Sequence, residues 1–562
     1  MTGHWLWIIF GAALGLRLWG IAFGLPDLFH QDELMTVKTA LSFGQGIGAV
    51  DYPHHPHLFH ELLFVGYAAA FLVGKGLGLW SSSAAYLQQF LQNPAPWVLG
   101  GRLMAAGFGA ATPWLLYRTV RETGAGEKTA LWSAAALAVC FLHVRDSHYC
   151  RQDIPALFFG VGAAWFALRA MLRGGRRDSW GAGLWTGLAM GMNWNFALWL
   201  PGLLLAHGLK PKGTPKLRPA LEAVGIALAC FALVNPAILL HAGETAGTLG
   251  RLAEGAGGVL REPDTPWTAG GWWRYLIVYL PVGVSWIGLL AGGIGWVGSL
   301  RKPSKPDLWL TAGMLAYGLL IGSYTRSVRA AYILPLAPFV LYYAVRWMEG
   351  RPVRLRALLL AGLFLSNGAA AVRHDWLLTR PDTRRLAREW VEAHVPSGTM
   401  LAVDHGRTFQ AWVPQLLETA EQSAQLAAAT RNSGKGSGLW WSARANQAAA
   451  RPRYRLIELI PREHLIPEME NGYDLDRLQR QGVTWVILSD FVESFVETAD
   501  SPKQDAFYAR LRAGGRPVVR FTPYDGQTDR RQLPSSHTPL IDLWRLKRPG
   551  PVIELYALEP GP

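Results

Sequence analysis

The stretch "FHQDELMTVKTA", residues 29–40, places two adjacent carboxylates, Asp32 and Glu33, just after a segment apolar enough for a lipid bilayer. That segment runs from Trp5 to Gly24. A carboxylate without a partner is costly beside lipid, so such groups usually have a buried partner or a function. The other reading is that both residues cap an interfacial helix, since Asp and Glu favour helix N-termini. The stretch therefore predicts a membrane span that ends at an ionisable site.

The composition is that of a membrane protein. Of the 562 residues, 50% are hydrophobic and only 17% are charged, and Trp occurs 26 times. Apolar runs of about 20 residues, the length that crosses a bilayer, recur through the first two thirds of the chain. The net charge of +14 does not indicate nucleic-acid binding. Its basic residues form short clusters between apolar runs, as the positive-inside rule predicts, and no basic stripe with interleaved aromatics occurs.

The fold class predicted from these runs is a polytopic α-helical membrane protein. The basic clusters fix about eleven spans with the N-terminus inside. Segment 58–80 is not counted, because a crossing there would reverse the side of every later basic loop; we expect a re-entrant or surface-lying helix on the outer side. The pair 181–193 and 195–208, hinged at "MNWN", could also form one long tilted helix. The predicted spans lie near 5–24, 97–117, 129–145, 154–172, 181–193, 195–208, 219–241, 275–298, 307–324, 330–348 and 355–372.

After Val372 the composition becomes polar, and no long apolar run remains. We predict two domains: residues 1–372 in the membrane, and residues 373–562 as a soluble α/β domain on the extracytoplasmic side. The segment "TRRLAREWVEAHV" reads as an amphipathic helix with Leu386, Trp390, Val391 and Val395 on one face. The predicted strands are "TMLAVDHG", "TWVILSDF", "PVVRFTPY" and "PVIELYALE".

Four segments distant in the sequence place ionisable residues on the predicted outer face. Carboxylates there suit proton abstraction, and arginine or histidine suits a phosphate. The His-rich segment together with Asp51 could also bind a divalent metal, although its spacing matches no standard closed site, so no metal site is assigned. The four groups are Asp32 and Glu33; His54, His55, His57 and His60; Arg145, Asp146, His148, Arg151 and Asp153; and Arg326, Arg329 and Tyr332.

Several motifs occur in the order found in a known class of enzymes. "HQDE", "HHPHL", "RLMAAGFGAATPWLLYRTVRETG", "HVRDSHYCRQDIPALFF" and "RAAYILPLAPFV" together resemble the GT-C membrane glycosyltransferases over most of residues 1–350. The most similar branches are the protein O-mannosyltransferases and the lipid A aminoarabinose transferases. "RPDTRRLAREWVEAHVPSG" is similar to the start of the outer domain of bacterial members. Two departures are "HPHL" for the usual "HPPL", and "SHYCRQD" where mannosyltransferases have "SR" before the Asp.

The resemblance implies inverting transfer of a sugar from a polyprenyl-phosphate carrier to an acceptor hydroxyl on the outer face of the cell (inner) membrane. Asp32 maps to the general base and Glu33 to a supporting acidic group. His55, Arg326 and Arg329 are the expected contacts of the donor phosphate. Asp153 maps to the acidic end of the second loop motif, where it and Arg145 either position the acceptor or pair to hold the loop. The acceptor can be a protein, a lipid or a polysaccharide.

Two other functions remain open from the sequence. A lipid-linked sugar flippase or another transporter also needs charged residues in its spans, but transporters tend to show internal repeats and interrupted helices at mid-membrane. No clear repeat occurs here, and the polar residues gather at one face. The third reading is a structural membrane protein whose function lies in the C-terminal tail.

Overall fold

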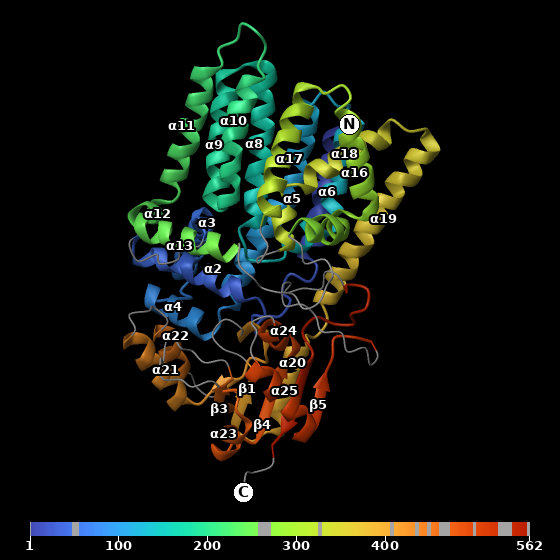
Figure 1. Cartoon of the computed structure of the whole chain (residues 1–562). Coiled ribbons are helices and arrows are strands. Elements are labelled where there is room, and N and C mark those ends of the chain that lie inside the picture. Colours follow the sequence, from blue (N-terminus) through green and yellow to red (C-terminus); the bar gives the residue numbers. More distant parts are fainter. Residues whose placement is uncertain are drawn as a thin grey trace.

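The computed structural model describes residues 2–47, 55–256, 271–323, 329–404, 410–432, 438–446, 451–459, 472–497, 502–525 and 542–558. A helical region leads into a C-terminal region built on a β-sheet (Figure 1). The helices of the first region are α1 (Thr2–Leu18), α2 (Gln31–Ser42), α3 (Leu58–Gly76), α4 (Ser83–Gln92), α5 (Ala95–Glu122), α6 (Glu127–Val139), α7 (Phe141–Asp146), α8 (Asp153–Arg173), α9 (Arg176–Met192), α10 (Trp199–Gly208), α11 (Leu217–Leu233), α12 (Pro236–Leu240), α13 (Ala242–Ala256), α14 (Gly271–Trp273), α15 (Leu280–Val284), α16 (Trp286–Ser299), α17 (Lys305–Gly322), α18 (Ala337–Glu349) and α19 (Val353–Leu378).

Three helical segments among the described residues are long and apolar enough to cross a membrane: Leu58–Gly76, Asp153–Arg173 and Val353–His394. A fourth is added if the bent pair Arg274–Val284 and Trp286–Ser299 is one span. Several predicted spans coincide with helices that are shorter or are broken, such as α1 and α6. The first of the three segments is α3, for which the sequence predicted a re-entrant or surface-lying helix that does not cross the membrane. The count of about eleven spans therefore stays a prediction.

The segment "MNWN" is a break between two helices. Helix α9 ends at Met192, and Asn193 accepts a hydrogen bond from the backbone N–H of Asn195 at 3.0 Å. Helix α10 then returns beside α9 (Figure 1), so the predicted hinge is confirmed and the single long helix is not formed.

Glycines let α9 and α11 approach closely. A Cβ atom on Gly183 would lie 2.3 Å from the Ala223 carbonyl oxygen, and one on Gly187 would lie 2.5 Å from the Ala227 oxygen. Residues four apart share one helix face, and small residues at this spacing allow close backbone packing of membrane helices. The α9–α11 pair thus has the geometry typical of helices packed within a bilayer.

The C-terminal region holds a mixed sheet in the order β2-β3-β1-β4-β6-β5. Strands β2, β3, β1 and β4 are parallel, and β6 runs antiparallel to both β4 and β5. All four predicted strands are confirmed, as β1, β4, β5 and β6, whereas β2 and β3 were missed. The elements are α20 (Thr383–His394), β1 (Met400–Val403), β2 (Leu417–Glu418), α21 (Ala420–Asn432), α22 (Gly438–Asn446), β3 (Arg453–Glu458), α23 (Leu475–Arg480), β4 (Trp485–Ser489), α24 (Asp490–Glu497), α25 (Pro502–Gly514), β5 (Arg516–Phe521) and β6 (Ile553–Ala557).

The two regions share packing. Helix α19 runs through the predicted division between residues 372 and 373, and that division stays a prediction. Leu543, Leu546 and Val552 from the C-terminal region belong to the same buried cluster as the membrane-region helices. The sheet-bearing region is therefore packed onto the helical region through buried apolar contacts.

The loop between α10 and α11 lies at the end of the helical region that is far from the sheet (Figure 1). This loop carries Lys210, Lys212 and Lys216, which favour the cytoplasm. We expect reporters fused within residues 211–215 and after Pro381 to be found in opposite compartments, the first inside and the second outside. Reporters in one compartment would contradict this orientation.

Candidate active site at the first turn of α2

The acidic pair begins α2. His30 is the N-cap, and its Nδ1 accepts a hydrogen bond from the Asp32 backbone N–H at 3.2 Å. Both carboxylates lie in the first turn, where the helix dipole favours negative charge. Their surroundings differ: the Glu33 side chain is fully buried, whereas 29% of the Asp32 side chain is exposed. The two acids are thus suited to different tasks.

Glu33 forms a buried ion pair with Arg102 of α5. Arg102 donates from Nε and Nη2 to the two Glu33 oxygens, each at 2.7 Å, and the Cys150 backbone N–H donates to Oε1 at 2.8 Å. The guanidinium also donates to the carbonyl oxygens of Ile21 and Phe23. Bidentate charge-assisted hydrogen bonds of this kind are strong and specific in geometry. These contacts favour a structural role for Glu33, and its predicted catalytic role stays a prediction.

Asp32 lies within a cluster of opposite charges, which we call the outer cluster: Asp32, Arg151, Asp153 and Arg329. Asp32 Oδ2 is 3.8 Å from Arg151 Nη1 and 3.9 Å from Arg329 Nη1. Arg151 also approaches Asp153 Oδ2 at 3.2 Å with its other terminal nitrogen. The distances from Asp32 Oδ2 to the two arginine nitrogens are longer than a hydrogen bond, so these two contacts are electrostatic.

The arginines of the outer cluster differ in exposure. The Arg329 side chain is 43% exposed, and that of Arg151 is 13% exposed. Burial by itself lowers the pKa of Arg151, but the charges of Asp153, Asp32 and Asp146 outweigh it and raise the pKa above its usual value. Arg151 is therefore a permanent cation, and the outer cluster presents positive charge beside a partly exposed carboxylate.

His55 lies in the field of the same four charges. Burial lowers its pKa to about 4, and the charge of Arg151 acts in the same direction, while Asp153 and Asp32 oppose them. The imidazole of the ligand-free protein is thus neutral at pH 7. It can offer a hydrogen bond to a phosphate but no charge.

The structure brings together Asp32, His55, Asp153 and Arg329 among the predicted site residues. Arg326 lies outside the described residues. Arg145 Nη1 lies 3.4 Å from Asp146 Oδ2, and Asp153 Oδ2 lies 3.2 Å from Arg151 Nη2. Neither Arg151 nor Arg102 was assigned a role from the sequence. The signals were present: Arg102 is a charge within an apolar run, and Arg151 is a basic residue in a loop that the sequence predicts to lie on the outer side.

Metal-ligating side chains occur at a second place. His148, His374 and Asp375 are buried, and their ligand atoms lie within 4.8 Å of one another, close enough to hold a metal ion. Asp375 Oδ1 is 3.0 Å from His374 Nδ1 and 3.5 Å from His148 Nε2. However, the ring nitrogens of His148 also lie 2.9 and 3.0 Å from two backbone carbonyl oxygens. Burial lowers the pKa of His148 to about 4, so the ring is neutral at pH 7. A neutral imidazole has one N–H and can therefore donate to only one of these two carbonyl oxygens.

The His-rich segment that was considered for a metal lies only partly within the described residues. Asp51 and His54 lie outside them. His57 and His60 are buried with ring centroids 5.7 Å apart, and the His57 backbone N–H donates to Asn235 Oδ1. The described part of this segment is packed against the helical region.

Comparisons with known proteins confirm the resemblance found in the sequence. Residues 98–239 match the family model described as dolichyl-phosphate-mannose-protein mannosyltransferase. Dolichyl-phosphate-mannose–protein mannosyltransferase 1 of Saccharomyces cerevisiae is 30% identical over 180 residues, which is 32% of this chain and 20% of the yeast protein. The chain thus matches about a fifth of the length of this curated relative.

Two solved structures share the fold over nearly the whole chain. ArnT from Cupriavidus metallidurans in the apo state has a TM-score of 0.53 and 12% identity, and covers 98% of both chains. ArnT from the same organism bound to undecaprenyl phosphate has a TM-score of 0.52 and 13% identity, and covers 99% of this chain and 98% of that one. The chain thus has a mostly helical, ArnT-like fold with a mixed sheet near the C-terminus, as expected of a multi-pass membrane protein.

The Glu33–Arg102 pair makes a stability prediction. Removing one partner of a buried ion pair leaves an uncompensated charge, so Glu33→Ala should lower the free energy of unfolding by about 3–5 kcal/mol. Asp32→Ala is the matched control, because that carboxylate is adjacent but partly exposed. Thermal unfolding of the purified variants checks this. Equal melting temperatures for Glu33→Ala and the wild type would contradict the structural role.

Proposed function

We propose that this GT-C, mannosyltransferase-like membrane glycosyltransferase moves a sugar from a polyprenyl-phosphate carrier to an acceptor hydroxyl on the outer face of the membrane. The observation that carries the proposal is the outer cluster: a partly exposed carboxylate within 4 Å of two arginines. The charges match a reaction that removes a proton from a hydroxyl and releases a phosphate anion.

In the proposed reaction the acceptor oxygen attacks the anomeric carbon from the side opposite the phosphate. The new bond joins the acceptor oxygen to the anomeric carbon, the bond from that carbon to the phosphate oxygen breaks, and the configuration inverts. Asp32 takes the hydroxyl proton as general base. The polyprenyl phosphate leaves as an anion, so the step needs no second carboxyl as acid, unlike the two-carboxyl mechanism of most glycosidases.

The donor phosphate would bind between Arg329 and Arg151, with Arg326 as a further proposed contact. Arginine recognises phosphate through paired N–H donors. Neutral His55 would add one hydrogen bond. Asp153, held by Arg151 at 3.2 Å, would position the loop that carries this arginine.

The proposed arrangement in the membrane follows from the proposed position of the outer cluster at the outer face. The N-terminus would lie inside, about eleven segments would cross the membrane, and residues 373–562 would lie outside, next to the outer cluster. The proposed partners are a polyprenyl-phosphate-linked sugar, membrane lipids and a protein, lipid or polysaccharide acceptor. The ArnT-like fold over nearly the whole chain supports this arrangement.

The base role of Asp32 makes a kinetic prediction. Asn keeps the shape of the side chain but cannot take the proton, so Asp32→Asn should reduce the transfer rate about 10²–10⁴-fold. Donor affinity should change little, because the arginines remain. The measurement is turnover beside donor binding on the purified, folded variant.

Two results would reject this role. Near-normal turnover of Asp32→Asn would show that another group takes the proton. Lost donor binding without a separate rate effect would place Asp32 among the binding residues instead.

The phosphate contacts make a separate prediction. A hydrogen bond to a charged group contributes about 1.5–3 kcal/mol, so Arg329→Ala and Arg151→Ala should each raise the donor KM roughly tenfold or more. Arg173→Ala is the control: Arg173 is exposed and pairs with Glu122, in a basic cluster predicted to be cytoplasmic. Donor kinetics unchanged in both site variants would reject the assignment.

A further inference from the structure

Residues 19–30 connect α1 to α2, and Asp32 follows in the first turn of α2. Leu28 in this connection has φ 57°, in the left-handed region. A branched residue rarely adopts this conformation, which persists only where the surrounding structure enforces it. The contacts that hold this connection are therefore of interest for the position of Asp32.

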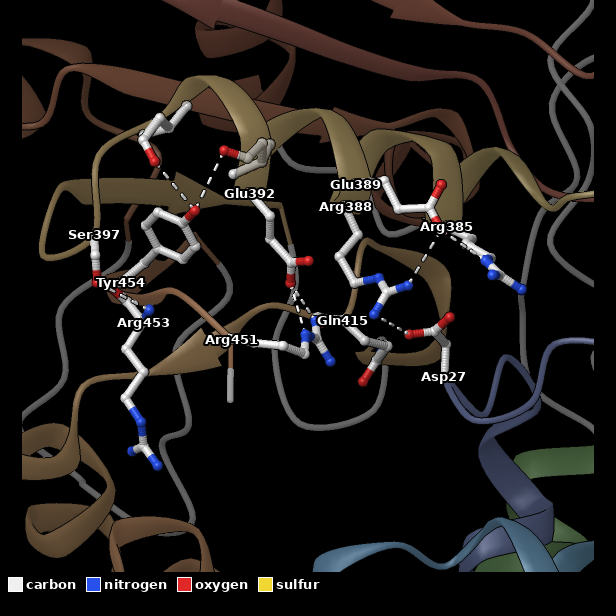
Figure 2. A network of polar contacts seen from close by, with 12 residues as sticks. Asp27, Arg385, Arg388, Glu389, Glu392, Ser397, Gln415, Arg451, Arg453 and Tyr454 are labelled. Atoms are coloured by element: carbon white, nitrogen blue, oxygen red, sulfur yellow. Dashed lines mark hydrogen bonds and ion pairs between the residues drawn. The ribbon is translucent and has the colours of Figure 1, made fainter. Parts of the chain in front are cut away.

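The first contact joins Asp27 to α20. Arg388 Nη1 lies 3.3 Å from Asp27 Oδ1, and only 10% and 2% of the two side chains are exposed. Figure 2 shows Arg388 reaching from α20 to Asp27, next to the exposed Arg385–Glu389 pair on the same helix. A pair so removed from solvent is screened little by salt.

The second contact joins Phe29 to Arg384, which lies one turn before Arg388 in α20. Arg384 Nη1 donates to the Phe29 carbonyl oxygen at 3.3 Å, and its guanidinium lies 4.1 Å from the centre of the Phe29 ring. Asp382 fixes this guanidinium by accepting from Nε at 2.8 Å and from Nη2 at 2.6 Å. Arg384 and Arg388 are four residues apart and hence lie on one face of α20.

Further contacts join the connection between α1 and α2 to the residues of the outer cluster. His30 follows Phe29, caps α2 and accepts from the Asp32 backbone N–H. The His30 ring packs on Tyr149 with 4.6 Å between centroids, and Tyr149 lies two residues before Arg151. Residues 27–30 thus link α20 to the first turn of α2 and to the loop that carries Arg151.

We propose that Arg384 and Arg388 are positioning residues for sugar transfer, holding residues 27–29 so that Asp32 stays aligned with Arg151 and Arg329. This inference rests on the proposed function. Helix α20, the first helix of the C-terminal region, would thus contribute to the alignment of the active site. Neither arginine touches the outer cluster; both act through the connection.

The test compares Arg388→Ala, Arg388→Lys and Asp27→Asn with the control Arg510→Ala, in which an exposed arginine of α25 that pairs with Asp476 is removed. Misplacement of a catalytic group by about 1 Å can cost roughly 10²-fold in rate, so kcat of Arg388→Ala should fall about 10–100-fold. The donor KM should stay within about twofold, because the phosphate contacts remain. Arg388→Lys should recover part of the rate, and Arg510→Ala should match the wild type.

Two further readouts separate positioning from stability. The double variant Asp27→Asn/Arg388→Ala should be no slower than the worse single variant, because both changes remove one contact. Hydrogen exchange of residues 27–33 should be faster in Arg388→Ala, while that of β1 should be unchanged. Both results would support the positioning role.

Failure of the positioning role can be distinguished from failure of the proposed function. Unchanged kcat in Arg388→Ala, in an enzyme that Asp32→Asn inactivates, overturns the positioning role and leaves the proposed function intact. A fall in kcat equal to that of Arg510→Ala, or without faster exchange at residues 27–33, also overturns it. Absence of transfer by the wild type overturns the proposed function and this inference together, even if the exchange result holds.

Discussion

The buried ion pair between Glu33 and Arg102 is the interaction on which the site depends. It joins the first turn of α2 to α5, to the carbonyl oxygens of Ile21 and Phe23 in the connection after α1, and to the backbone of Cys150. Because Glu33 is fixed inward, its neighbour Asp32 is directed to a different environment, where it remains partly exposed. One carboxylate thus holds the helix, and the other is available for chemistry. A buried pair need not add net stability, so orientation explains its presence better.

The outer cluster is assembled from segments that are far apart in the chain, each fixed by its own contacts. Arg102 and Cys150 hold Glu33, Arg151 holds Asp153, and α20 holds the connection before α2. The apolar packing of Leu543, Leu546 and Val552 against the membrane-region core ties the C-terminal region to the same frame. Rigid elements that position a few charged groups are what electrostatic catalysis requires, because such groups then need no reorganisation during the reaction.

Much of this could be predicted from the sequence, and the misses have physical reasons. The order of motifs predicted the family resemblance that the comparisons confirm, and the strand-like segments after Val372 predicted β1, β4, β5 and β6. Strands β2 and β3 were missed; β2 has two residues, and β3, "RYRLIE", is rich in charge. The amphipathic helix was found, but its buried face includes Arg384 and Arg388 in place of Leu386 and Trp390, which are half-buried. Hydrophobic periodicity cannot identify arginines that are buried because they have partners distant in the sequence.

The outer cluster is proposed to transfer a sugar from a lipid carrier rather than to move the lipid across the membrane. Mass spectrometry of glycans and lipids from cells that lack the protein, labelled before extraction with a reagent that cannot cross the membrane, tests this proposal most directly. The account predicts that one sugar disappears from its acceptor, that the matching polyprenyl phosphosugar accumulates on the outer leaflet, and that only a chain with an intact Asp32 reverses both changes. Unchanged glycans and lipids, or accumulation of the lipid-linked sugar on the inner leaflet, would contradict it.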